Sequence, residues 1–236
     1  PGSAQELGFG HGAAALLVTA DTADALAVIA GSAHLSADFV DHYRMAGAEF
    51  DYTLEDRWVR DEALGKLVPR AIERVLAGTG LAATDIRTLV VPVAAAAARR
   101  IAQGSGLESA AIADNLQERC GDTGSAHPLL MLIAALESAS PGDRILVIGF
   151  GQGVDALIVE ARPALEKRRP RALSAALARG IEEPHYVRYL AHAGMLDVDL
   201  FRRVIDEAGP SLGRVDFFNY GEAFLHKRAV EMCAYI

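Results

Sequence analysis

Two glycine-rich phrases contain the residue types that could hold a phosphate group. GFGHG occupies residues 8–12, GFGQG occupies residues 149–153, and an apolar run follows each phrase. A dinucleotide site needs the spacing G-x-G-x-x-G followed by a helix, and a P-loop needs a lysine after its glycines. Neither phrase has that spacing or that lysine, and a strand rather than a helix is predicted after each. The phrases therefore indicate tight turns and argue against nucleotide binding.

The sequence also argues against metal, nucleic-acid and membrane binding. Cys120 and Cys233 form no C-x-x-C spacing, so we expect no metal site and a reduced cytoplasmic compartment. A net charge of −8 is unfavourable for a nucleic-acid surface. No run reaches the roughly 18 apolar residues that a membrane-spanning helix requires.

The hydrophobic pattern predicts strands and helices that alternate around a buried sheet. Strands are predicted at residues 13–18, 25–30, 88–92, 144–148 and 154–160. Helices are predicted at residues 54–77 (with a kink at Pro69), 94–103 and 126–139, and loops at residues 33–53 and 108–125. Near-continuous apolar strands favour the α/β class with helices on both faces of the sheet.

The second phrase repeats the first beyond its glycines. Seven of eleven positions agree between residues 8–18 and 149–159. Either two turns before buried strands agree by coincidence, or the chain contains an internal duplication. A duplication predicts that the two turns are equivalent corners of two similar halves. Because seven residues precede the first copy, it also implies an upstream half that this sequence lacks.

The order of motifs in residues 85–161 resembles the thiolase superfamily. DIRTLVVPVAAAAARRIAQGSGL and CGDTGSAHPLLMLIAALESASPGDRILVIGFGQGVDALIVEA are similar to the C-terminal half of ketoacyl-ACP synthase III and HMG-CoA synthase. GFGHGAAALLV is similar to the F-G-D-G-A-A-A strand late in their N-terminal half. The sequence most resembles relatives that work with an OB-fold zinc-ribbon protein, such as a benzoylsuccinyl-CoA thiolase subunit.

This resemblance implies a thiolase-like layered sandwich, α-β-α-β-α in a complete protein. Residues 1–45 would be the end of an incomplete N-terminal half, and residues 46–165 would be the C-terminal half. Residues 166–236 would be a basic linker and a helical C-terminal appendage. The tail from residue 184 has too many apolar residues to remain solvated, so we expect it to cover the sandwich or a partner.

Members of the superfamily use a cysteine nucleophile that carries the acyl group as a thioester. It lies in their N-terminal half, so neither Cys120 nor Cys233 matches it, and we expect it on upstream sequence. Their H-Q-A histidine falls at Val93, which cannot exchange a proton. Their second catalytic position falls at Asp122, between Gly121 and Thr123. Asp122 would act as a base or hydrogen-bond donor, or would merely cap the following helix or fix its loop.

The second glycine phrase matches the turn that binds the oxyanion in these enzymes. The backbone N–H of Gln152 would complete the oxyanion hole, flanked by Gly151 and Gly153. Gly149 stands where degradative thiolases have a second cysteine, which argues against their two-cysteine mechanism. His127 would either touch the substrate or serve the structure of its helix.

Two functions remain open on this resemblance. The first is an acyl-CoA C-acyltransferase that makes or breaks a C–C bond beside a CoA thioester, by Claisen condensation or thiolysis. The second is a non-catalytic scaffolding or binding subunit, which Val93 favours. The first implies acyl-CoA as substrate, no permanent cofactor, a thiolase-type dimer and the OB-fold partner. A basic cluster would meet the CoA phosphates or form a solvated face: Arg162, Lys167, Arg168, Arg169 and Arg171.

Overall fold

The chain forms two compact units, which are described separately. The structure is a computed structural model, and it describes residues 6–39, 42–43, 45–47, 52–53, 55–167, 171–192, 199, 202–203 and 206–207. One unit comprises Ala4–Arg179, and the other comprises Pro1–Ser3 with Gly180–Ile236. The second unit contains α8 (Tyr186–His192). The predicted boundaries after residues 45 and 165 stay predictions.

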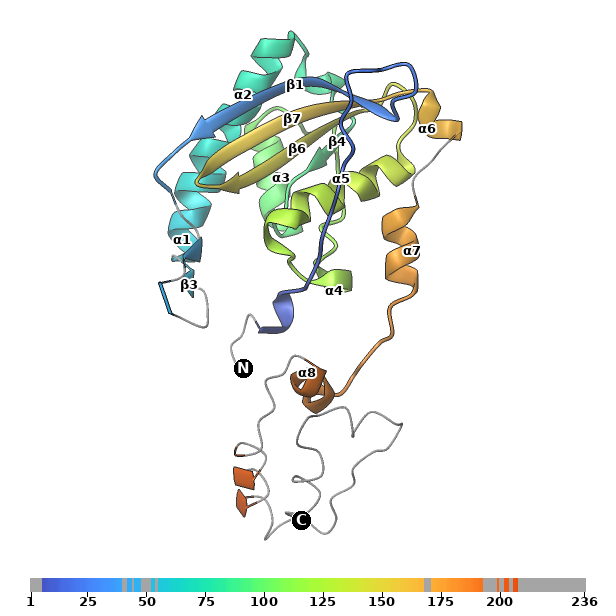
Figure 1. Cartoon of the computed structure of the whole chain (residues 1–236). Coiled ribbons are helices and arrows are strands. Elements are labelled where there is room, and N and C mark those ends of the chain that lie inside the picture. The colour runs from blue at the N-terminus through green and yellow to red at the C-terminus, as the bar shows by residue number, and fades with distance from the viewer. Residues whose placement is uncertain are drawn as a thin grey trace. The chain divides into compact units, whose positions relative to one another are not determined.

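A five-stranded mixed sheet organises the larger unit (Figure 1). Its order is β1-β7-β6-β4-β5. Strands β6, β4 and β5 run parallel, whereas β7 is antiparallel to both β6 and β1. The strand bounds are Ala27–Ser36 for β1, Thr88–Val90 for β4, Ala111–Ile112 for β5, Arg144–Gly151 for β6 and Gly153–Ala161 for β7. The short pair β2 (His42–Tyr43) and β3 (Tyr52–Thr53) forms a separate antiparallel ribbon.

Helices cover both faces of this sheet (Figure 1). One face packs against α2 (Val68–Thr79) and α3 (Ala95–Gly104). The other packs against α5 (His127–Ser138), α6 (Ala164–Lys167) and α7 (Ala172–Ala178). The remaining helical segments are η1 (Glu6–Gly8), α1 (Asp56–Trp58), η2 (Val59–Leu67), η3 (Ala83–Asp85), α4 (Gln117–Cys120) and η4 (Gly124–Ala126).

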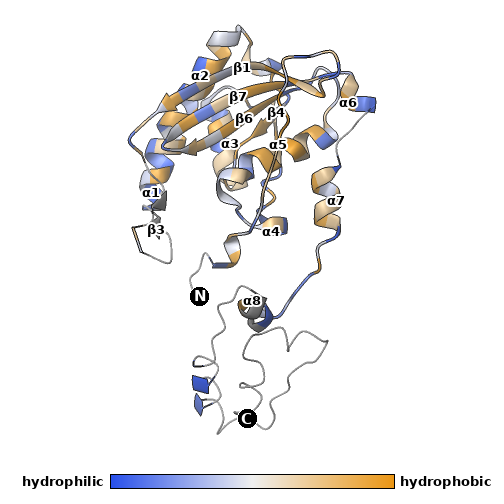
Figure 2. Cartoon of the chain, in the orientation of Figure 1, coloured by the Kyte–Doolittle hydropathy of each residue, from blue (hydrophilic) through white to orange (hydrophobic). Residues whose placement is uncertain are grey.

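The alternation of side chains along β6 explains why its sequence is almost continuously apolar. Leu146 and Ile148 belong to the core under α2 and α3, whereas Ile145 and Val147 belong to the core under α5. Successive side chains of a strand point to opposite faces, so a strand with helices on both sides has no solvent-facing positions. Figure 2 shows the resulting hydrophobic strands and the hydrophobic α5. The α/β prediction with two covered faces is confirmed.

The predicted strand at residues 13–18 is wrong. These residues pair with no strand of the described sheets, and Leu16, Leu17 and Val18 are 44%, 96% and 74% exposed. A strand exists only where a neighbour satisfies its backbone groups, and local apolar character does not supply that neighbour. The two glycine phrases are therefore not equivalent corners here. The second is the β6–β7 hairpin, whereas η1 and an unpaired segment flank the first.

Several predicted loops and boundaries also change. Strand β1 runs to Ser36, into the expected loop 33–53, because it pairs with β7 along its length. The expected loop 108–125 contains β5 and α4, both too short for periodicity to reveal. The long helix predicted with a kink at Pro69 changes its helix type between Leu67 and Val68. The π-helix η2 ends at Leu67, and α2 begins with Pro69 in its first turn, where a missing N–H costs nothing.

Candidate active site

The first glycine phrase is paired with the loop that contains Asp122. The Gly10 N–H donates to the Asp122 carbonyl oxygen at 2.8 Å, and the Asp122 N–H donates to the Gly8 carbonyl oxygen at 2.7 Å. Phe9 and Asp122 thus form a parallel bridge, although 112 residues lie between them in the sequence. The predicted equivalence of the two phrases missed this arrangement. The first phrase supports the candidate site by holding the backbone of its central residue.

The close approach of these two segments depends on glycine. An added Cβ at Gly10 would lie 1.7 Å from the Cys120 carbonyl oxygen, inside the contact distance of any two atoms. Gly121 has a φ of 67°, and a Cβ there would lie 2.7 Å from the Gly10 nitrogen. Only a residue without a side chain fits at either position. Gly10 and Gly121 therefore serve backbone packing.

Asp122 itself is half-buried at the centre of this crossing. Its Oδ1 accepts a hydrogen bond from the Gly124 N–H at 2.8 Å, so the carboxylate stabilises the turn before α5. This contact fixes the loop and does not cap α5, whose N-terminus has no side-chain cap. It uses one carboxylate oxygen, and the same group has further lone pairs with which to accept a proton. Neither of the two predicted roles of Asp122 excludes the other.

His127 is completely buried at the first residue of α5. Its Nδ1 lies 3.2 Å from the Thr123 nitrogen and 3.1 Å from the Thr123 hydroxyl oxygen. Its Nε2 lies 2.6 Å from the Asn115 carbonyl oxygen. Both ring nitrogens are therefore occupied by protein groups, which favours the structural alternative for His127 over substrate contact.

Asn115 is a residue that the sequence analysis missed. Its Nδ2 donates to the Val93 carbonyl oxygen at 3.2 Å and to the Gln117 Oε1 at 3.0 Å. The following residue, Leu116, has a φ of 58°, the only described non-glycine residue with a positive φ. The D-N-L-Q sequence 114–117 contained a signal, because Asp and Asn side chains favour turns, but the partners could not be foreseen.

Val93 lies after β4 with 9% of its surface exposed, and it packs in the core under α2 and α3. This apolar burial agrees with its lack of proton chemistry. The position that carries a histidine in the resembled enzymes contributes here a carbonyl oxygen, which Asn115 binds.

The predicted oxyanion turn is the hairpin between β6 and β7. Gly151 and Gly153 are paired across it, and Gln152 is exposed at its tip. Gly153 has a φ of 124°, and a Cβ there would lie 2.0 Å from the Leu35 carbonyl oxygen, so glycine is required. The base of this turn lies near α5, because a Cβ at Gly149 would be 3.9 Å from Pro128 Cγ. The resemblance also implies that Asp122 and the Gln152 N–H line one pocket, and this stays a prediction.

Cys120 lies beside the site without the features of a nucleophile. Burial raises the pKa of its thiol, which lowers the thiolate fraction at neutral pH. Its Sγ lies 3.4 Å from the Leu116 carbonyl oxygen, a contact that a thiol makes as donor. Cys233 lies outside the described residues.

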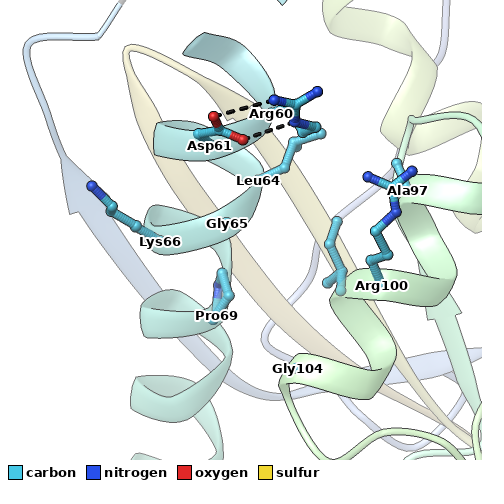
Figure 3. A pocket seen from close by; sticks show the side chains of 10 residues that line it. Arg60, Asp61, Leu64, Gly65, Lys66, Pro69, Ala97, Arg100 and Gly104 are labelled. Carbon is cyan, nitrogen blue, oxygen red and sulfur yellow. Dashed lines mark hydrogen bonds and ion pairs between the residues drawn. The ribbon is translucent and has the colours of Figure 1, made fainter. Parts of the chain in front are cut away.

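A cavity of about 460 Å³ lies elsewhere, between η2 and α3 (Figure 3). Its charged side chains include Arg60, which is paired with Asp61 at 2.8 Å, and Arg100. Lys66, also at its rim, is paired with Glu62 at 2.6 Å. None of the predicted site residues lines this cavity.

The structure describes only part of the basic cluster that was predicted to meet the CoA phosphates or to form a solvated face. Arg162 is paired with Glu160 at 3.2 Å, Lys167 and Arg171 are exposed, and Arg168 and Arg169 lie outside the described residues. Within the part of the chain that the structure describes, no three His, Cys, Asp or Glu side chains could together hold a metal ion. Among the same residues, no helix is long and apolar enough to span a bilayer.

Comparisons with known proteins agree with this architecture. The family model described as 3-oxoacyl-(acyl-carrier-protein) synthase III, C terminal, matches residues 76–160. A hydroxymethylglutaryl-CoA synthase from Methanothermobacter thermautotrophicus is 31% identical over 201 residues, which cover 82% of this chain and 56% of that protein. Another from Methanopyrus kandleri is 35% identical over 100 residues, which cover 41% of this chain and 28% of that protein.

Among solved structures, 3-oxoacyl-(acyl carrier protein) synthase III from Pseudomonas aeruginosa PAO1 aligns with a TM-score of 0.48 at 20% identity. The alignment covers 57% of this chain and 44% of that one. By these sequence matches, the chain is similar to the C-terminal part of the synthase III family and to the hydroxymethylglutaryl-CoA synthases. The chain spans 56% of the length of the first of these synthases.

Proposed function

We propose that this chain is the C-terminal part of an acyl-CoA C-acyltransferase of thiolase type. The observation that carries the proposal is the crossing of residues 8–10 over Asp122, which holds the backbone of this residue at a fixed position before α5. The relatives named hydroxymethylglutaryl-CoA synthase support a CoA thioester as substrate. The nucleophilic cysteine is proposed to lie on sequence outside this chain.

In the proposed reaction, a cysteine thiolate attacks the thioester carbonyl, the C–S bond to CoA breaks, and CoA leaves as a thiolate that takes a proton from water. For condensation, a carbanion beside a second thioester attacks the enzyme-bound acyl group, a C–C bond forms, and the cysteine thiolate is released. Thiolysis is the reverse. In both directions, negative charge develops on the acyl oxygen, and the Gln152 N–H would stabilise it.

Asp122 would take the proton in the condensation direction and return it in thiolysis. Val93 cannot share this task, so the carboxylate would be the proton-transfer group that this chain supplies. A general base that is held at a fixed position typically contributes about 100-fold or more to the rate. Asp122→Asn retains the size of the side chain and its capacity to accept from Gly124, and it removes the base.

The test uses the natural polypeptide that contains this chain, assayed for CoA release from acetyl-CoA and for thiolysis of 3-ketoacyl-CoA. We expect turnover that Asp122→Asn lowers by about 100-fold, with the fold unchanged by circular dichroism. Turnover that is insensitive to Asp122→Asn would reduce this residue to a turn cap.

The second candidate function is a non-catalytic subunit, favoured by the buried valine at position 93. It would bind acyl-CoA or a partner without turning the thioester over. A thiolase-type dimer and an OB-fold zinc-ribbon partner are proposals under either function. Acyl-CoA binding by calorimetry without CoA release, in the natural polypeptide and with the partner present, would favour this candidate.

A further inference from the structure

Three hydrogen bonds connect the segments around Asp122 into one chain, which we name the His127 clamp. The Thr123 N–H meets His127 Nδ1 at 3.2 Å, His127 Nε2 meets the Asn115 carbonyl oxygen at 2.6 Å, and Asn115 Nδ2 donates to the Val93 carbonyl oxygen at 3.2 Å. The clamp therefore joins the loop after β4, the segment after β5 and the loop before α5.

The partners determine the proton positions on His127. A backbone N–H can only donate and a carbonyl oxygen can only accept, so Nδ1 accepts from Thr123 and Nε2 carries the hydrogen toward Asn115. The Thr123 hydroxyl, 3.1 Å from Nδ1, can donate to the same nitrogen. The neutral Nε2–H tautomer satisfies every contact, and complete burial excludes water as a substitute partner.

The clamp and the first glycine phrase hold adjacent residues of the same loop. Residues 8 and 10 hold the backbone of Asp122, and His127 holds the next residue, Thr123. The far end of the clamp is Val93, the position after β4 where the resembled enzymes have a histidine. The left-handed Leu116 follows Asn115, a cost that persists only where surrounding contacts impose it.

We propose that His127 and Asn115 are positioning residues, which fix the Asp122 loop relative to the end of β4. This inference rests on the proposed function, because it assigns these two residues to the same acyl-transfer site. They do not touch the substrate. They determine where the Asp122 carboxylate stands, through Thr123.

Three substitutions of His127 test its two hydrogen bonds separately. In His127→Asn the amide oxygen occupies approximately the place of Nδ1 and can accept from Thr123. In His127→Gln the amide nitrogen occupies approximately the place of Nε2 and can donate to Asn115. His127→Leu retains neither bond. Met131→Ala, one turn along α5 and also fully buried, is the matched control that creates a cavity without affecting the clamp.

In the natural polypeptide, we expect His127→Leu to lower kcat by about 10- to 100-fold, the size expected from a catalytic group misplaced by about 1 Å. KM should change less than kcat. His127→Asn should recover most of the loss, because it retains the bond nearest to Asp122. Equal kcat for His127→Leu and Met131→Ala, compared at equal folded fraction, would overturn the proposal, and so would equal kcat for all three His127 variants.

Two measurements on the 236-residue chain do not depend on turnover. The ¹⁵N shifts of the His127 ring should report the Nε2–H tautomer, and the Thr123 amide should exchange faster in His127→Leu than in His127→Asn. An Nδ1–H tautomer or unchanged Thr123 exchange would overturn the clamp. If the wild type turns over no thioester but passes both measurements, the proposed function fails and the clamp stands.

Discussion

At the scale of single residues, Gly10 is where the candidate site is most easily broken. A Cβ at this position would overlap the Cys120 carbonyl oxygen, and the overlap involves backbone atoms that cannot rotate away. We expect Gly10→Ala to lower the free energy of unfolding by about 1–3 kcal/mol, the usual cost of forcing atoms into a packed region.

Urea denaturation measures this loss, and Gly8→Ala is the matched control. A Cβ at Gly8 would meet nothing within 4 Å, although Gly8 is two residues away in the same phrase. Equal effects of the two substitutions would contradict the close approach of residues 8–10 to the loop 120–123.

Glu183 provides a pH-dependent prediction in the smaller unit. Arg188 Nη1 lies 2.8 Å from its Oε2, and hydrogen bonds from Arg188 hold the pKa of the Glu183 carboxyl at about 2. Because this pKa is lowered in the folded chain, the stabilisation is present above the ordinary carboxyl pKa. It is lost as the pH falls through about 2. We expect Arg188→Gln to raise the pKa of Glu183 toward its usual range. The pH dependence of the ¹³C shift of the carboxyl measures this pKa. A pKa that stays near 2 in the variant would assign the shift to another group.

At the scale of elements, a side chain of α5 binds the N–H groups at the start of α7. Glu137, near the end of α5, accepts from the Leu173 N–H at 2.9 Å and from the Ser174 N–H at 3.2 Å. These N–H groups belong to the first turn of α7, where no intrahelical acceptor exists. A carboxylate at this end also interacts favourably with the helix dipole. A seven-residue helix needs such support.

We expect Glu137→Ala to cost about 0.5–2 kcal/mol, the typical value of an N-terminal cap, and to speed amide exchange at Leu173 and Ser174. The exposed Glu166 provides the control, because Glu166→Ala removes a carboxylate from the neighbouring α6. Protection of the α7 amides that survives Glu137→Ala would show that packing of Leu173 alone forms the helix.

At the scale of the whole molecule, the division into two units predicts the effect of truncation. The sheet and both of its helical layers lie within Ala4–Arg179. A chain that ends at Arg179 should therefore retain a cooperative thermal transition, measured by circular dichroism. If the apolar tail covers a partner or a second copy, as its composition predicts, truncation should weaken association in sedimentation experiments. Loss of the transition would instead make the tail part of the core.

The sequence alone determined most of the central sheet and its helices. Strands β4, β6 and β7 and helices α3 and α5 lie where local patterns predicted them, because each has a complete apolar face within its own residues. The loop 121–123, the start of α5 and the β6–β7 turn were also identified, through their resemblance to a known family. Each of these features depends on a short stretch of the chain, so the local sequence is sufficient to predict it.

Only the tertiary structure decided what these stretches contact. Residues 13–18 have the composition of a strand and are not one, because a strand requires a neighbour that no local pattern can report. The glycine phrase at residues 8–12 looked like a turn and instead packs on Asp122. His127 could have faced the substrate or the core, and the structure buries it against Asn115 and Thr123, with Asn115 in turn bonded to the Val93 carbonyl oxygen. Hydrogen-bond partners far apart in sequence are chosen by folding of the whole unit, which is why the clamp became visible only there.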